Sequence, residues 1–164
     1  MKAPASPLLR LWRFALPAGW YAVICGFSGQ TAAVSGALSD RLLYQLLEAA
    51  SGAFRALSET GRLAVVEFLS YYERKGAHMF LYFVLAGLLL FALSPWVRSA
   101  PRRAAAALAV CAALAALDEF HQTFVPGRSG ELRDVLVDLT GSACLLLVWF
   151  LVRSVRRAWG KPSA

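Results

Sequence analysis

Four long apolar stretches constrain how this chain of 164 residues can fold. They run from about residue 11 to 27, 78 to 97, 104 to 124 and 134 to 152. A helix needs about 20 apolar residues to cross the hydrocarbon core of a bilayer, which is about 30 Å thick. Because backbone polar groups in lipid must be satisfied within the segment, we predict an all-α, polytopic membrane helical bundle with about four transmembrane helices, forming one domain over residues 1–164.

The composition supports a protein that lives in a membrane. Hydrophobic residues make up 59% of the chain and charged residues 16%, and the mean hydropathy is +0.55. These values are too apolar for a soluble globular domain, and they exclude an intrinsically disordered chain. Three cysteines, each inside an apolar stretch, do not fit a small disulfide-stapled secreted domain.

The first apolar stretch has two interpretations. Arg10 and Arg13 flank the start of a short apolar run that is followed by small residues, which is also typical of a secretory signal peptide. We expect a retained helix. Cleavage would leave an odd number of spans, and one set of basic loops would then lie outside the cytoplasm, against the positive-inside rule. Pro17 and Gly19 are expected to kink this helix.

The charges separate into two groups along the chain. Ten bases and no acid lie before or at the start of the first stretch, between the second and third, and after the fourth: Lys2, Arg10, Arg13, Arg98, Arg102, Arg103, Arg153, Arg156, Arg157 and Lys161. The remaining seven bases and all ten acids lie in the other two connections or in the ends of the stretches next to them. The first set of segments therefore carries a charge of +10 and the second a charge of −3. The positive-inside rule predicts a multi-pass protein of the cytoplasmic (inner) membrane with both termini in the cytoplasm. Since topology accounts for the basic residues, we expect no nucleic acid partner.

The outer connection, residues 28–77, is too long for a simple turn. Apolar spacing after a possible cap at Ser39 and Asp40 predicts an amphipathic helix, carried by Leu42, Leu43, Leu46 and Leu47. A second helical segment over 61–72 is expected to continue into the second stretch. The alternative is a partly ordered linker, because serine, glycine and alanine are frequent here.

Ionisable side chains at membrane depth are costly and usually mark a functional site. Three groups occur here: Arg74, Lys75 and His78 with Tyr82 one turn deeper; Asp118, Glu119 and Gln122; and Asp134 and Asp138 with Gly141. Helical spacing places most members of each group on one face. The predicted topology brings all three groups to the outer leaflet, where the 124–133 loop with Arg128 covers them. The adjacent carboxylates of Asp118 and Glu119 would repel unless a cation, a metal or a proton lies between them.

Each group also has a structural explanation. Arg74 and Lys75 could be interfacial anchors whose charged ends reach the lipid headgroups. Asp134 could stabilise the start of its helix through the helix dipole. Asp138 could form a structural ion pair with a nearby base. The convergence of three separate segments on one level favours a site over these separate explanations.

Two segments resemble a known family. They are "ERKGAHMFLYFVLAG" and "LDEFHQTFVPGRSGELRDVLVDLTG", and "FSGQ" at 27–30 adds a third match. They are similar to the VanZ-like family of small bacterial membrane proteins, whose pattern is matched here by Lys75, His78, Asp118, Glu119, Gln122, Pro126, Gly127, Arg128, Asp134, Asp138 and Gly141. Many members have Asn where this chain has Asp138. The resemblance implies about four spans, and the founding member is associated with resistance to the glycopeptide antibiotic teicoplanin.

These observations support three hypotheses about function. The first is an envelope enzyme acting on a phospholipid or lipid-linked precursor, in which bases hold an anion, His78 or Glu119 is the general base, and the other carboxylates orient partners or hold a divalent cation. Its candidate catalytic residues are His78, Asp118, Glu119, Asp134 and Asp138, and its candidate substrate-binding residues are Arg74, Lys75, Tyr82, Gln122 and Arg128. The second is a noncatalytic binder that shields such a precursor or a lipoglycopeptide. The third is an ion-coupled transporter, although four short spans leave little room for the two gates that a transporter needs. No recognised metal-ligand spacing is present, so the cofactor is left open.

Overall fold

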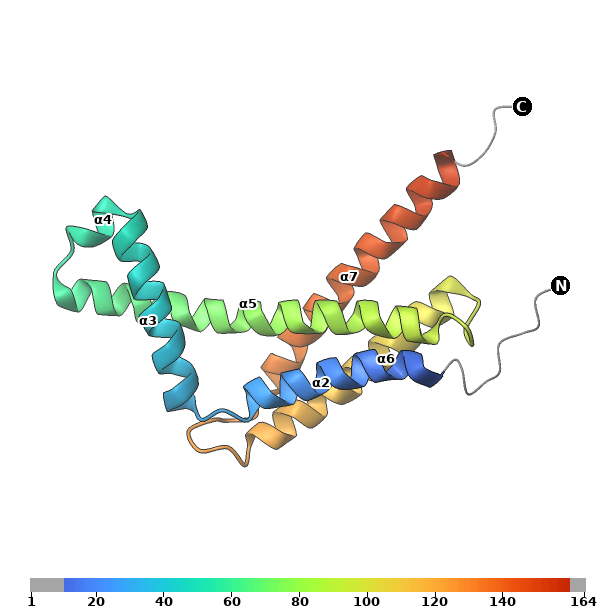
Figure 1. The fold of residues 1–164 in the computed structure, drawn as a ribbon, viewed down its shortest axis with the longest axis horizontal. Helices are drawn as coiled ribbons and strands as arrows, with labels where there is room; N and C mark the ends of the chain where they lie inside the picture. Colours follow the sequence, from blue (N-terminus) through green and yellow to red (C-terminus); the bar gives the residue numbers. More distant parts are fainter. Residues whose placement is uncertain (1–10, 160–164) are drawn as a thin grey trace.

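The structure, a computed structural model, describes residues 11–159 and is helical throughout its regular elements (Figure 1). The elements are the 3-10 turn η1 (Trp12–Phe14) and the helices α2 (Ala15–Ser28), α3 (Ala32–Ala50), α4 (Gly52–Arg55), α5 (Glu59–Leu93), α6 (Ala100–Gln122) and α7 (Leu132–Trp159). This confirms the predicted all-α class. The basic residues Lys2, Arg10 and Lys161 lie outside the described part of the chain.

Within residues 11–159, three helices rather than four are long and apolar enough to cross a membrane: α5, α6 and α7. The predicted first span is shorter, because α2 has 14 residues and follows the three-residue turn η1. Pro17 accounts for this. It lacks an N–H to donate to the carbonyl of residue 13, and its ring clashes with that carbonyl, so the helix is interrupted by the 3-10 turn η1 just before Ala15.

The second predicted span, 78–97, is the end of a much longer helix. Helix α5 has 35 residues, or about 52 Å at 1.5 Å per residue, which exceeds the roughly 30 Å hydrocarbon core. The prediction that 61–72 is helical and runs on into the span is therefore confirmed. The helix ends at Leu93, because Pro95 has no N–H to donate to the carbonyl of Phe91, which accepts the N–H of Ser94 instead. The third and fourth predicted spans correspond to α6 and α7, and α7 continues to Trp159.

Helix α5 is the central element of the fold. It contacts α2, α3, α6 and α7, and Figure 1 shows α2 and α6 along its C-terminal half, while α7 crosses it near its middle. Helix α3 packs on the N-terminal part of α5 beyond this bundle and is followed by α4, which contacts α3. Arg62 of α5 forms an ion pair with Glu48 of α3 at 3.3 Å. The connection 28–77 is thus largely helical, as predicted, rather than a partly ordered linker. The cap expected at Ser39 and Asp40 is wrong, because α3 begins at Ala32 and the side chain of Thr31 accepts the N–H of Val34.

Small residues allow the helices of the bundle to approach closely. One stripe of α6 is buried, formed by Ala104, Ala107, Cys111 and Ala115, and it packs in one cluster with Leu85 and Ala86 of α5 and Ile24 of α2. Large apolar side chains remain exposed around the bundle, as expected of surfaces that face lipid.

Helix α2 is fastened to the bundle by hydrogen bonds as well as by packing. The indole Nε1 of Trp20 donates to the carbonyl oxygen of Leu81 at 2.9 Å. The hydroxyl of Tyr21 donates to the carbonyl oxygen of Leu114 at 3.1 Å. These contacts tie α2 to both α5 and α6.

Candidate functional site

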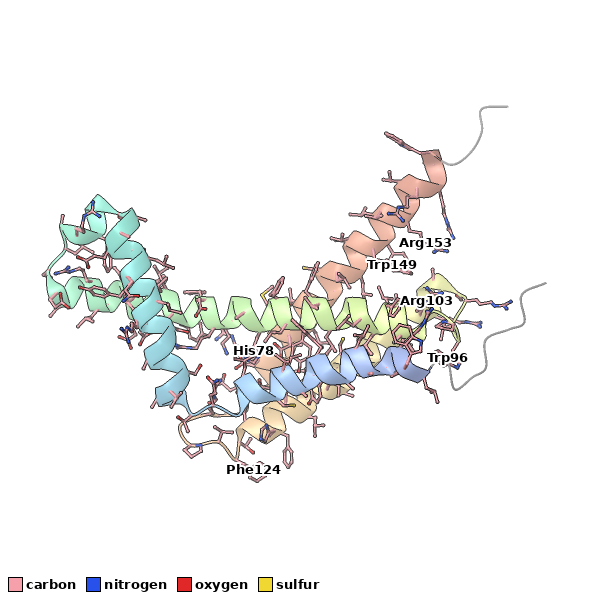
Figure 2. All side chains as sticks on the ribbon, in the orientation of Figure 1. His78, Trp96, Arg103, Phe124, Trp149 and Arg153 are labelled. Carbon is pink, nitrogen blue, oxygen red and sulfur yellow. The ribbon has the colours of Figure 1, made fainter. Side chains whose placement is uncertain are left out.

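A cavity of about 430 Å³ lies where α3, α5, the end of α6, the loop after it and the start of α7 meet. Eight of the ten predicted site residues line it: Arg74, Lys75, His78, Glu119, Gln122, Arg128, Asp134 and Asp138. Asp118 and Tyr82 are fully buried and do not line it. In Figure 2, His78 lies near the middle of α5, and Trp96 and Arg103 lie at the far end of the bundle. The three sequence groups therefore meet at one level of the molecule.

Two polar contacts join α5 to α7 in the cavity wall. Nδ1 of His78 lies 3.6 Å from Oδ1 of Asp138, whose side chain is only 1% exposed. One turn earlier on α7, Asp134 forms an ion pair with Lys75. The partner of Asp138 is therefore the histidine rather than one of the bases considered from sequence.

The close approach of α5 and α7 depends on Gly141. A Cβ atom on Gly141 would lie 2.0 Å from the backbone oxygen of Met79, the residue after His78. The next residue of α7, Ser142, donates its hydroxyl to the carbonyl oxygen of Tyr82 at 3.3 Å. Gly141 therefore leaves room for a neighbour, and that neighbour is the backbone of α5.

The two adjacent carboxylates of α6 are separated by hydrogen-bond donors. Oδ2 of Asp118 accepts from the hydroxyl of Ser28 at 2.7 Å and from Nε2 of Gln122 at 3.2 Å. The same Nε2 donates to Oε1 of Glu119 at 3.1 Å, while Oε2 of Glu119 accepts the backbone N–H of Glu131 at 3.0 Å. Asp118 thus ties α2 to α6, and Glu119 ties the following loop to α6.

The loop between α6 and α7 is fixed by three further features. Nε of Arg128 donates to the carbonyl oxygen of Gln30 at 3.0 Å. Gly127 has a φ of 77°, which favours glycine. A Cβ on Gly130 would lie 2.3 Å from the carbonyl oxygen of Glu119. The "FSGQ" segment singled out in the sequence therefore supplies, through Ser28 and Gln30, two of the contacts that hold the site together.

Sequence reasoning missed one wall of the cavity. Helix α3 contributes Ser35, Gly36 and Asp40, and the first part of α5 contributes Glu67 and Tyr71. The two α5 residues had a signal, because Glu67 and Tyr71 precede Arg74 and His78 at helical spacing on one stripe. The α3 residues had none, since only the packing of α3 on α5 brings them here.

The donor set does not form a metal centre on its own. Among the residues that the structure describes, no three His, Cys, Asp or Glu side chains come together in a way that could hold a metal ion.

Comparison with known proteins identifies the family. A family model described as VanZ/LLP1 matches residues 14–153. The chain belongs to the VanZ/LLP1 family. The match includes every wall of the cavity and nearly all of the three spanning helices, so the VanZ-like resemblance of the sequence motifs is confirmed. Together, the family and the apolar helices identify a multi-pass membrane protein. No curated protein and no solved structure matched the chain.

Proposed function

We propose that this VanZ/LLP1 protein binds the polar part of a phospholipid or lipid-linked envelope precursor in the cavity and acts on it, with His78 as the general base. Arg74 and Arg128 line the cavity and would hold a phosphate or another anionic group. Gln122 and Lys75 complete the predicted binding surface. The charge pattern of the sequence supports the outer leaflet of the cytoplasmic membrane as the location.

The depth of the cavity supports a lipid over a soluble ligand. On α7, Asp138 precedes Arg153 by 15 residues, which is about 22 Å of helix. Arg153 lies 5.7 Å from the ring centroid of Trp149, a pairing typical of a membrane interface. Measured from that interface, Asp138 remains within a hydrocarbon core of about 30 Å. The polar part of a lipid would reach this level without leaving the membrane.

The observation that carries the proposal is the contact of His78 with buried Asp138. A carboxylate near Nδ1 orients an imidazole and stabilises its protonated form, which leaves Nε2 for a ligand in the cavity. The separation of 3.6 Å is longer than a hydrogen bond, as is common in catalytic sites without substrate. Glu119, the other candidate base, already accepts a hydrogen bond on each oxygen.

The chemistry that follows is transfer of a phosphoryl or acyl group. His78 would take a proton from an attacking water or hydroxyl, whose oxygen bonds to phosphorus or to the acyl carbon. The proton then passes from His78 to the leaving oxygen as its bond breaks. Histidine suits both steps because its ordinary pKa lies close to neutral pH.

The test is mass spectrometry of envelope lipids incubated with purified protein. Wild type is expected to generate a product that His78→Asn does not, because Asn can still donate toward Asp138 but has no nitrogen that accepts a proton. His121→Asn is the matched control, since His121 is exposed and does not line the cavity. A product formed equally by His78→Asn would overturn the assignment of the base.

A noncatalytic binder is the second candidate. It is favoured by the carboxylates of Glu119 and Asp134, which are engaged within the protein and hold its walls together. In this case a lipid co-purifies with wild type but no lipid is converted. Shielding of a lipid-linked precursor is one route by which such a protein would lower susceptibility to teicoplanin.

A further inference from the structure

The walls of the cavity carry more negative than positive charge. Six carboxylate side chains line it, against three cationic side chains and His78; the six are Asp40, Glu67, Glu119, Glu131, Asp134 and Asp138. A ligand with negative charge alone would meet an excess of like charge, which is unfavourable wherever water is partly excluded. The balance of charges therefore favours a ligand that also carries positive charge.

Some of these charges are already matched within the protein. Lys75 forms an ion pair with Asp134, and Glu119 accepts two hydrogen bonds. Of the cationic side chains, Arg74 and Arg128 form no ion pair with another described residue. Two arginines thus remain for an anionic group, and the carboxylates that remain outnumber them.

The unmatched charges are separated along the cavity. Glu67 precedes Arg74 on α5 by seven residues, or about 10 Å. Asp40 lines the cavity from α3, which packs on this first part of α5. One end of the cavity is therefore acidic, with Asp40 and Glu67, and the next part along α5 is basic, with Arg74.

Unpartnered carboxylate oxygens provide independent support. The side chain of Asp138 is 1% exposed and lines the cavity; its Oδ1 lies 3.6 Å from His78, beyond hydrogen-bond distance, and neither of its oxygens has a hydrogen-bond partner among the described residues. Oδ1 of Asp40 is likewise buried and unpartnered within the described chain. Buried polar atoms without partners are unfavourable, so the cavity is suited to a ligand rich in N–H donors.

We propose that the ligand is a phospholipid whose headgroup carries an ammonium group as well as a phosphate. The phosphate binds between Arg74 and Arg128, and the ammonium binds between Asp40 and Glu67. This inference rests on the proposed function, because it names the class of lipid that the same cavity accepts. It adds selectivity, since an anionic headgroup with the same phosphate lacks the charge that the acidic end requires.

The test compares two lipids that differ in their headgroups. Purified full-length protein in nanodiscs or detergent is offered phosphatidylethanolamine and phosphatidylglycerol with identical acyl chains, and the retained lipid is measured by native mass spectrometry. Wild type is expected to prefer phosphatidylethanolamine about 10-fold, equivalent to about 1.4 kcal/mol. The variant Asp40→Asn/Glu67→Gln is expected to reduce the preference to about 2-fold or less. Glu73→Gln is the matched control, because Glu73 is exposed on α5 and does not line the cavity.

The outcomes separate this inference from the proposed function. Equal retention of both lipids by wild type would overturn the ammonium site and leave lipid binding standing. A preference that survives in the double variant would overturn the placement at Asp40 and Glu67. Retention of neither lipid would overturn this inference and would contradict a phospholipid as the ligand in the proposed function. The Asp40→Asn change in the double variant could disturb the packing of α3. The single variant Glu67→Gln alters only an exposed side chain, so it tests the placement of the ammonium group without that risk.

Discussion

At the scale of single residues, Gly141 determines how closely α5 and α7 approach, and with it the separation of His78 from Asp138. The backbone of Met79 occupies the space that any side chain at Gly141 would need. Because His78 and Asp138 lie within a turn of this crossing, the geometry of the candidate base depends on a residue that makes no polar contact itself.

Gly141→Ala is therefore expected to destabilise the bundle by about 1–3 kcal/mol, since the helices must separate to accept the methyl group. The measurement is the thermal denaturation midpoint of the purified protein in detergent. Gly26→Ala is the control, because a Cβ at Gly26 in α2 meets nothing within 4 Å. Equal midpoints for the two variants would show that the crossing is less tight than described.

Ser28 makes the corresponding contact between α2 and α6. Removal of its hydroxyl in Ser28→Ala leaves Asp118, which is fully buried, with one donor fewer. We expect a loss of about 1–3 kcal/mol in unfolding free energy. Denaturant unfolding in mixed micelles measures it, with Ser154→Ala on the exposed side of α7 as control. An unchanged unfolding free energy would mean that water replaces the serine.

At the scale of elements, the loop between α6 and α7 forms one wall of the cavity and is held by Glu119. Oε2 of Glu119 accepts the N–H of Glu131, and Gly130 packs against the backbone of Glu119. Glu119→Ala is expected to raise hydrogen exchange of the loop amides at least several-fold, because the loop loses its only side-chain acceptor from α6 among the described contacts. Glu73→Ala is the comparison. Unchanged exchange in the loop would contradict this role.

The elements also show what could be predicted from the sequence. Apolar length identified α5, α6 and α7, and helical spacing grouped most of the residues that line the cavity. Hydropathy alone registers only the apolar half of α5, whereas the apolar spacing over 61–72 predicted that this helix continues into the span. The shortness of α2 follows from Pro17, a local effect that apolar length does not capture.

The α3 wall could not be predicted, because it depends on tertiary packing. Asp40 and Ser35 show no pattern that sets them apart from other polar residues of an amphipathic helix. They reach the cavity because α3 packs on α5, where Arg62 contacts Glu48. Contacts between distant segments of this kind leave no spacing in the sequence.

At the scale of the whole molecule, the charge distribution predicts which side of the membrane the cavity faces. Ser99→Cys and Ser129→Cys, each in a chain whose native cysteines are replaced, place one thiol at each end of the bundle. In intact cells a membrane-impermeant thiol reagent is expected to label the cysteine at 129 and to label that at 99 only after lysis. The reverse pattern would place the cavity on the cytoplasmic side.

The central claim is that the cavity holds the polar part of a lipid, and native mass spectrometry of the purified protein tests it most directly. Wild type is expected to retain a phosphate-bearing lipid, and Arg74→Gln to retain it about 10-fold less, because a charged hydrogen bond to the phosphate is lost. Arg41→Gln, on the exposed side of α3 and outside the cavity, is expected to match wild type. Equal retention by all three proteins would contradict the account.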